Sequence, residues 1–108
     1  MPWPKVEGCP EFTNVNWVHP LFQKRVSALI DYTKDNYPYV KKIVVFGSAV
    51  TNRCTSWSDV DLCIFGDYDL KFIPPLDGTR YDVLWAQHLT PDCDIWRKIE
   101  KEGVLVYG

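Results

Sequence analysis

Three aspartates on two apolar segments are the residues whose types and spacing could do chemistry. Asp59 and Asp61 open the segment DVDLCIF, and side chains two apart in a strand point to the same face. Paired carboxylates raise one another's pKa, and Mg²⁺, which prefers oxygen ligands, relieves that repulsion. Asp82 lies inside the apolar segment TRYDVLWA, where an unpaired buried carboxylate is disfavoured. If these two strands are neighbours, the acids form one cluster suited to metal-assisted phosphate chemistry.

A phosphate-binding turn is expected just before these acids, where the apolar strand KIVVFG ends at Gly47-Ser48. Glycine lets the backbone approach a phosphate closely, and a helix that starts after it directs free N–H groups at the anion. The Ser48 hydroxyl can cap that helix or bind a phosphate oxygen. Gly-Ser and Asp-x-Asp are each common alone, but their combination between two apolar strands favours a site for metal-assisted phosphate chemistry.

The same pattern has a plainer interpretation, in which a strand, a turn and a surface strand carry solvated acids. On that interpretation Asp82 faces water from an edge strand. We assign other acids nearby to loops: Asp77 in PPLDGT is expected to be a turn residue, and Asp67 and Asp69 are expected to be solvated.

The residues above resemble the signature of the nucleotidyltransferase superfamily (polymerase beta-like), in particular its minimal nucleotidyltransferase (MNT) family. That signature is Gly-Ser, ten intervening residues, Asp-x-Asp, and a third Asp on a later strand. Gly47-Ser48, Asp59-Val60-Asp61 and Asp82 match it, and SDVDL looks like the characteristic SDxDL of the family. The tail EGVLVYG looks like the usual end of these domains, so the resemblance covers roughly residues 20–108.

The resemblance implies an α/β (α+β) nucleotidyltransferase fold in one domain, with a mixed, twisted sheet backed by helices and the acids on its open face. Asp59 and Asp61 would hold Mg²⁺ against the phosphates of the nucleotide. Asp82 would complete a second metal position or accept the proton of the attacking hydroxyl. Gly47 and Ser48 would position the triphosphate of the substrate, ATP.

The loop after Ser48 departs from the family pattern. Many relatives carry arginines and a glycine there, whereas this chain has Ala49-Val50-Thr51-Asn52. Arg53 is the nearest candidate to bind the triphosphate, and a solvated surface arginine is the alternative. Asn52 tolerates a left-handed backbone and is expected to take the place of the helix-ending glycine.

The MNT resemblance also implies a partner, a HEPN-type toxin whose tyrosine receives AMP from ATP. Polymerases and antibiotic-modifying relatives carry a second domain that holds the acceptor, whereas this chain stops at Gly108, so the acceptor is expected on another polypeptide. Two alternatives remain open. One is an inactive antitoxin that acts by binding alone; the other is an antibiotic (aminoglycoside-type) nucleotidyltransferase completed by a second subunit or a second copy of this chain.

Composition limits the alternatives. A chain of 108 residues with 46% hydrophobic residues suits one compact domain, and a net charge of −2 argues against a nucleic-acid partner. The chain has four cysteines and no CxxC pair, which indicates free thiols: Cys9, Cys54, Cys63 and Cys93. It also shows no signal peptide, so a cytoplasmic location is expected. Cys63 shares a strand face with the acids and is expected to be a small packing residue. No segment is long enough to span a membrane.

The remaining segments supply the scaffold. Residues 1–19 contain three prolines and a glycine and are expected to form an irregular extension packed through Trp3, Phe12 and Trp17. A helix is predicted from His19-Pro20 to about residue 37, and another over TPDCDIWRKIEKEG that starts at Thr90-Pro91-Asp92 and ends at Gly103. VLVY is the predicted final strand, and residues 20–108 the nucleotidyltransferase domain. The linker DYDLKFIPPLDG is expected to be a hairpin connection or a loop near the site.

Overall fold

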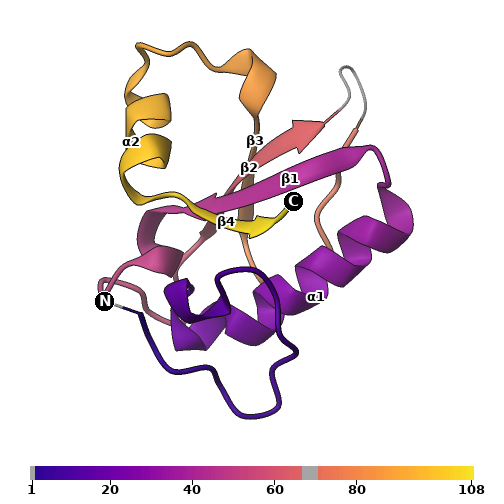
Figure 1. The fold of residues 1–108 in the computed structure, drawn as a ribbon, viewed down its shortest axis with the longest axis vertical. Coiled ribbons are helices and arrows are strands. Elements are labelled where there is room, and N and C mark those ends of the chain that lie inside the picture. The colour runs from indigo at the N-terminus through magenta and orange to yellow at the C-terminus, as the bar shows by residue number, and fades with distance from the viewer. Residues whose placement is uncertain (1, 67–70) are drawn as a thin grey trace.

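Two helices and four strands form a single α+β domain in the computed structural model, which describes residues 2–66 and 71–108 (Figure 1). The helices are α1 (Pro20–Asn36) and α2 (Asp94–Glu102), and the strands are β1 (Val40–Phe46), β2 (Val60–Gly66), β3 (Tyr81–Trp85) and β4 (Val104–Tyr107). Three short 3-10 turns, η1 (Val15–Trp17), η2 (Gly47–Val50) and η3 (Ala86–His88), complete the fold. The expected fold class is confirmed.

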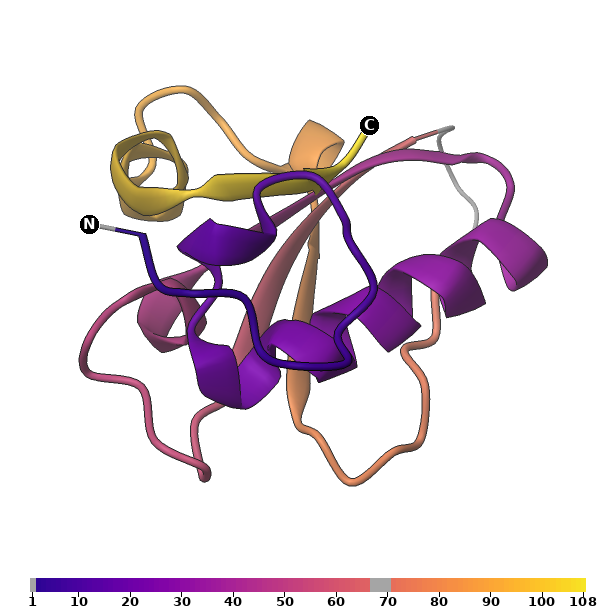
Figure 2. The same ribbon diagram turned by 60° about the horizontal axis from the view of Figure 1, so that its bottom comes forward.

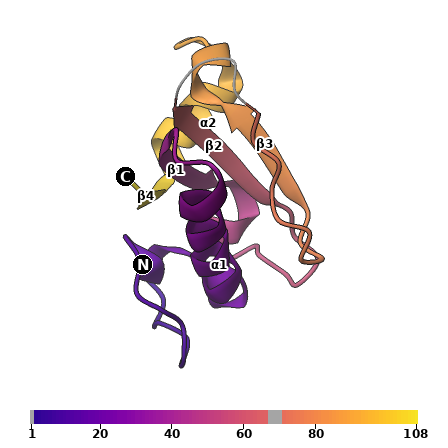
Figure 3. The same cartoon turned by 90° about the vertical axis from the view of Figure 1, so that its right-hand side faces the viewer.

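The sheet is mixed and has the strand order β3-β2-β1-β4. Strand β1 pairs antiparallel with β2 and with β4, while β2 and β3 run parallel. Figure 3 shows β3 and β4 at opposite edges of the twisted sheet. The two central strands, β1 and β2, hold most of the buried residues of the sheet, because a strand pairs with them on each side and a helix covers each face.

The two helices lie on opposite faces of the sheet (Figure 2). Against α1 lies the larger core, whose buried members include Phe22, Val26, Leu29, Ile43, Val45, Val60, Leu62 and Ile64. Against α2 lies a smaller cluster of Phe46, Cys63 and Ile99. Because side chains alternate along a strand, Leu62 on the first face places Asp61 and Cys63 on the second. The acids therefore share a face with α2, so the expectation of an open acid face is wrong over the part that α2 covers.

The connection from β2 to β3 is a crossover and not a hairpin, because parallel neighbours cannot be joined by a tight turn. Its described part, residues 71–80, runs alongside α1. Phe72 is buried in the larger core, and the Tyr32 hydroxyl donates to the Ile73 carbonyl at 2.5 Å. The Tyr39 hydroxyl donates to the carbonyl of Lys71. Asp67 and Asp69, which are expected to be solvated loop acids, lie outside the described residues.

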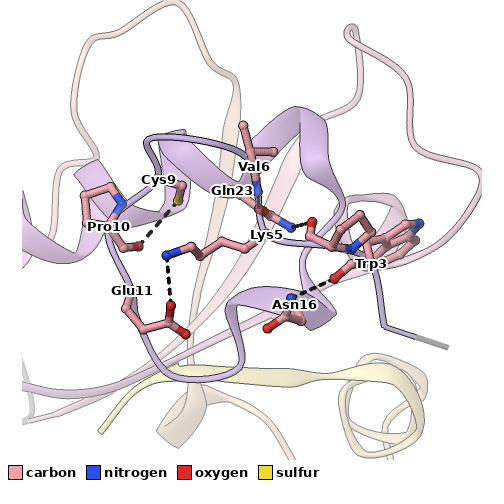
Figure 4. Close-up of polar contacts among 9 residues, drawn as sticks. Trp3, Lys5, Val6, Cys9, Pro10, Glu11, Asn16 and Gln23 are labelled. Carbon is pink, nitrogen blue, oxygen red and sulfur yellow. Dashed lines mark hydrogen bonds and ion pairs between the residues drawn. The ribbon is translucent and has the colours of Figure 1, made fainter.

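The N-terminal extension is fastened to α1 through one buried glutamine (Figure 4). The Gln23 side chain is fully buried and accepts a hydrogen bond from the Val6 N–H at 2.6 Å. Its amide nitrogen donates to the carbonyls of Pro4 and Val18, both at 3.1 Å. Among residues 2–19, the buried ones are Cys9, Val15 and Val18.

The aromatic residues expected to anchor the extension behave differently from one another. Phe12 packs against the larger core, and the Trp3 ring lies 5.1 Å from that of His19. Trp17 is 46% exposed, so its expected role as a packing anchor is wrong. The extension also forms the turn η1, which its prolines and glycine did not predict.

Both helices begin with a side-chain cap, and only the first was predicted. His19 Nδ1 accepts from the Leu21 N–H at 3.2 Å, with Pro20 at the first helical position. Helix α2 begins at Asp94, because the Cys93 sulfur accepts from the Trp96 N–H at 3.3 Å. The predicted start at Thr90-Pro91-Asp92 is therefore wrong, while the predicted stop at Gly103 is confirmed.

All four cysteines are free thiols, and burial raises the pKa of Cys63 to about 11. This thiol is a packing residue of the smaller cluster, as expected. Within residues 2–66 and 71–108, no helix is both long and apolar enough to cross a membrane.

Candidate functional site

The parallel pairing of β2 with β3 places two of the three predicted acids side by side. In this register Asp61 is the partner of Asp82. Paired residues of neighbouring strands point to the same face, so both carboxyl groups lie on the face that carries α2. The prediction that the two acid-bearing strands are neighbours is confirmed.

Asp59 lies on the same face but at the entrance to the strand. It directly precedes β2, which begins at Val60, so it is not itself paired in the sheet. Its carboxylate lies 3.6 Å from Nε of Arg80, the residue that precedes β3. Both side chains are substantially exposed, so this ion pair contributes little to stability.

Asp61 is the group on which the electrostatics of the site converge. Its pKa is raised to about 6, first by burial and next by the negative charge of Asp82. A hydrogen bond with Asp82 and the charge of Asp59 act in the same direction, while the ammonium of Lys98 lowers the pKa. The three carboxyl groups thus interact as one set, and Asp61 lacks enough positive charge to offset its negative neighbours.

The Asp82 side chain is exposed to solvent, although the apolar residues around it in the sequence predicted burial. It is solvent-exposed, because β3 is an edge strand. The alternative interpretation of an edge-strand carboxylate in contact with water is thus correct for its exposure. That interpretation is incomplete, because the same side chain is also paired with Asp61. An acid that contacts both water and the cluster is open to an incoming acceptor.

Two features require a glycine at position 47: its backbone conformation and its close approach to Asp61. Its φ is +78°, a conformation that side chains other than hydrogen disfavour. A Cβ at this position would lie 2.0 Å from Oδ2 of Asp61. The glycine therefore brings the turn after β1 into direct contact with the acids, and the Gly-Ser motif and the Asp-x-Asp motif meet in space.

The turn after Gly47 differs from the predicted helix. Residues 47–50 form the 3-10 turn η2, which is too short to supply a helix dipole. Ser48 lies inside this turn and its side chain makes no cap, so the predicted capping role is wrong. Asn52 does not end the turn in a left-handed conformation; among the described residues other than glycine, Asn14 alone has a positive φ.

The positive charge that acts on Asp61 comes from helix α2 and not from Arg53. Arg53 is exposed beyond η2, and its backbone N–H donates to Thr51 Oγ1 at 3.3 Å. The cation whose charge lowers the pKa of Asp61 is instead Lys98 of α2. The sequence analysis did not single out Lys98.

Glu102 is a second residue of α2 that the sequence analysis did not single out. Its Oε1 accepts a hydrogen bond from the Gly47 N–H at 3.3 Å and lies 3.8 Å from the ammonium of Lys98. The spacing of four residues between Lys98 and Glu102 predicts a shared helix face, but the sequence does not say what that face meets.

The donor set suits a magnesium ion that a substrate helps to bind. Among the residues that the structure describes, no three His, Cys, Asp or Glu side chains form a group that could hold a metal by themselves. Mg²⁺ is commonly held by one or two carboxylates together with waters and substrate phosphates. The acids around Asp61, whose pKa both Asp82 and Asp59 raise, fit that kind of site.

Comparison with protein families agrees with this geometry. A family model described as nucleotidyltransferase domain matches residues 26–104, which include the turn at Gly47-Ser48 and all three acids. The chain therefore belongs to the nucleotidyltransferase domain family, and the superfamily expected from its motifs is correct. A search of curated proteins gave no match.

Proposed function

We propose that this nucleotidyltransferase moves AMP from Mg·ATP to a hydroxyl group of a partner protein. The observation that carries the proposal is the meeting of Gly47 with Asp61, and of Asp61 with Asp82, on one face of the sheet. A phosphate-binding turn and a carboxylate pair at contact distance are the two parts that nucleotidyl transfer requires.

The roles follow from position and exposure. Asp59 and Asp61 would hold Mg²⁺, as the resemblance implies, and the ion would neutralise the phosphates and polarise the α-phosphate. Gly47 and Ser48 position the triphosphate through the turn after β1. Asp82 accepts the proton of the acceptor hydroxyl, because it is the acid that contacts both solvent and the cluster.

The chemical step is an in-line displacement at the α-phosphorus. The acceptor oxygen forms a bond to this phosphorus while the bond to the bridging oxygen of the β-phosphate breaks. The proton of the hydroxyl passes to the carboxylate of Asp82, and pyrophosphate leaves with the electron pair of the broken bond. The product is a phosphodiester between AMP and the acceptor.

A protein acceptor is supported by how open the site is. Asp82 lies on an edge strand and is exposed, so a bulky acceptor reaches it without any rearrangement of the sheet. We propose that this acceptor is a tyrosine of a HEPN-type toxin and that the chain acts as its antitoxin in the cytoplasm. This part of the proposal rests on the resemblance to MNT proteins.

One observation favours a second candidate, an inactive antitoxin that acts by binding alone. The loop after Ser48 lacks the arginines that hold a triphosphate in many relatives, and the Gly47 N–H is already hydrogen-bonded to Glu102. A protein of this kind would neutralise its partner without chemical modification.

Intact-mass spectrometry distinguishes these candidates. The purified chain is incubated with Mg·ATP and the product of a neighbouring gene, with Asp82→Asn as the matched inactive variant. Each AMP transferred adds about 329 Da to the acceptor. We expect this shift with wild type and no shift with the variant. Binding without a mass change favours the inactive antitoxin, and modification of an aminoglycoside without a partner favours the antibiotic enzyme.

A further inference from the structure

One oxygen atom of Glu102 lies between two donors that suit a phosphate. Glu102 Oε1 accepts from the Gly47 N–H at 3.3 Å and lies 3.8 Å from Nζ of Lys98. A backbone amide and an ammonium are the donors by which proteins commonly hold a phosphate oxygen. The amide belongs to the residue that contacts Asp61, so this oxygen lies at the edge of the acid cluster.

We infer that Glu102 is an internal competitor of the nucleotide, which a phosphate oxygen displaces to reach the Gly47 amide and the Lys98 ammonium. This inference rests on the proposed function, because it names the groups that receive the triphosphate. It assigns Lys98 as a nucleotide-binding residue and Glu102 as the carboxylate that occupies its position in the free protein.

The charge of Lys98 reaches the acids as well as Glu102. It is the cation that lowers the pKa of Asp61, so it lies close enough to act on both groups. Its side chain is 51% exposed and is not confined by packing. A triphosphate held near Asp61 would bring several negative charges to this ammonium in exchange for the single charge of Glu102.

Lys98 also compensates for the lack of positively charged side chains in the turn after Ser48. That turn contributes Ala49, which is fully buried, followed by Val50 and Thr51. Arg53 comes later and is exposed. Lys98 on α2, near the same Glu102 oxygen as the Gly47 amide, supplies the positive charge that the turn lacks.

Glu102 has room to leave once it is displaced. It lines an open groove of about 580 Å³ whose other walls include Trp17, Val50, Leu105 and Lys101. Its side chain is 22% exposed, and it is the last residue of α2. Rotation into this groove would bring the carboxylate toward the ammonium of Lys101, so the displaced charge meets water and a new cation.

Calorimetric titration of the full chain tests this inference with Mg·ATP and, separately, with inorganic tripolyphosphate. Glu102→Gln removes the charge but retains an acceptor for the Gly47 amide, and we expect it to bind both probes about tenfold more tightly than wild type does. Lys98→Gln should bind both about tenfold more weakly. Glu100→Gln and Arg97→Gln, on exposed neighbouring positions of α2, serve as controls and should differ from wild type by less than about twofold.

Opposite signs for the two variants distinguish displacement from a structural role. If Glu102 only fastens the turn at Gly47, Glu102→Gln keeps that acceptor and binds neither probe more tightly than wild type does, and the inference is overturned. Equal binding by wild type and both variants overturns it too, while leaving the proposed function intact. If wild type binds neither probe but Glu102→Gln does, the inference is supported. Binding by none of the proteins overturns the inference and the proposed function together.

A folding control accompanies these titrations. The unfolding temperature of each variant is measured without ligand, and Glu102→Ala provides a second charge-removing variant. We expect Glu102→Ala to tighten tripolyphosphate binding as Glu102→Gln does, even if it unfolds at a lower temperature. Weaker binding by Glu102→Ala, with tighter binding by Glu102→Gln, would show that the amide of the variant glutamine holds the phosphate and would overturn displacement.

Discussion

The two faces of the sheet treat their polar side chains in opposite ways. On the α1 side, the fully buried Gln23 has a partner for each of its polar atoms, all from the protein itself. On the α2 side, Asp61 is half-buried beside two groups of its own charge, and its pKa is raised to about 6. A polar group satisfied by the protein serves the fold, whereas one left in deficit of positive charge is available to a ligand.

The largest expected effect is on the ligand-binding side of this comparison. Asp61→Asn should lower the rate of nucleotidyl transfer by about a thousandfold, because it removes a carboxylate that both holds Mg²⁺ and completes the cluster. Its unfolding temperature without ligand should stay equal or rise, since like-charge repulsion is relieved. Rate assays measure the transfer rate and thermal denaturation measures the unfolding temperature. Asp31→Asn, on the exposed side of α1, is the control. A large loss of stability would place Asp61 with the structural groups.

Gln23 should show the reverse pattern. Gln23→Leu deprives the Val6 N–H and the carbonyls of Pro4 and Val18 of their partner. We expect a loss of about 2–4 kcal/mol in the free energy of unfolding, because buried unsatisfied groups are costly. Chemical denaturation gives this value, and exposed Gln87→Leu is the matched control. The folded protein should bind nucleotide with unchanged affinity. A loss of affinity without a loss of stability would contradict a purely structural role for Gln23.

The pH dependence of stability sharpens the comparison further. The pKa of Asp61 is higher in the folded state than the ordinary value of 3.8, so the folded state binds this proton more readily. Stability of the metal-free protein should therefore rise as pH falls through about 6 toward 4. We expect a gain of about 1 kcal/mol from this group after allowance for solvent screening. Thermal unfolding between these pH values checks it, and Asp61→Asn should lack the gain.

The smallest expected effect is on the N-terminal cap of α2, the helix that covers the site. Cys93 caps α2 through a sulfur, a weaker acceptor than a hydroxyl oxygen. Cys93→Ser should raise the free energy of unfolding by about 0.5 kcal/mol. Cys63→Ser is the matched contrast, since a hydroxyl in the dry cluster beside Phe46 and Ile99 should destabilise the protein. If both serines have the same sign, Cys93 does not act as a cap.

The sequence was sufficient for what depends on local spacing. The Asp-x-Asp spacing, the neighbouring acid strand and the His19-Pro20 helix start were all predicted, because alternation and capping are properties of a few adjacent residues. The nucleotidyltransferase family followed from the same motifs. The start of α2 was missed because Thr90 and Asp92 are better capping residues than Cys93, and tertiary packing placed the helix later.

What depends on contacts between distant segments was not predictable. Gln23 gives no sign in the sequence that Pro4 and Val6 surround it. Lys98 and Glu102 look like an ordinary helical ion pair until the end of α2 is placed against Gly47. The exposure of Asp82 follows from the strand order, which leaves β3 at the edge. Each of these properties is fixed by the sheet order or by packing between segments far apart in the chain.

The parallel register of β2 and β3 gives the site an uneven tolerance of insertions and deletions. Because Asp61 and Asp82 face each other across two strands, residues added within the crossover at 71–80 lengthen a loop and leave the pair intact. One residue added within β3 itself would turn Asp82 to the α1 face and bring an apolar neighbour to Asp61. Length variation in descendants or designed versions of this chain should therefore collect in the crossover, while the five residues of β3 keep their frame.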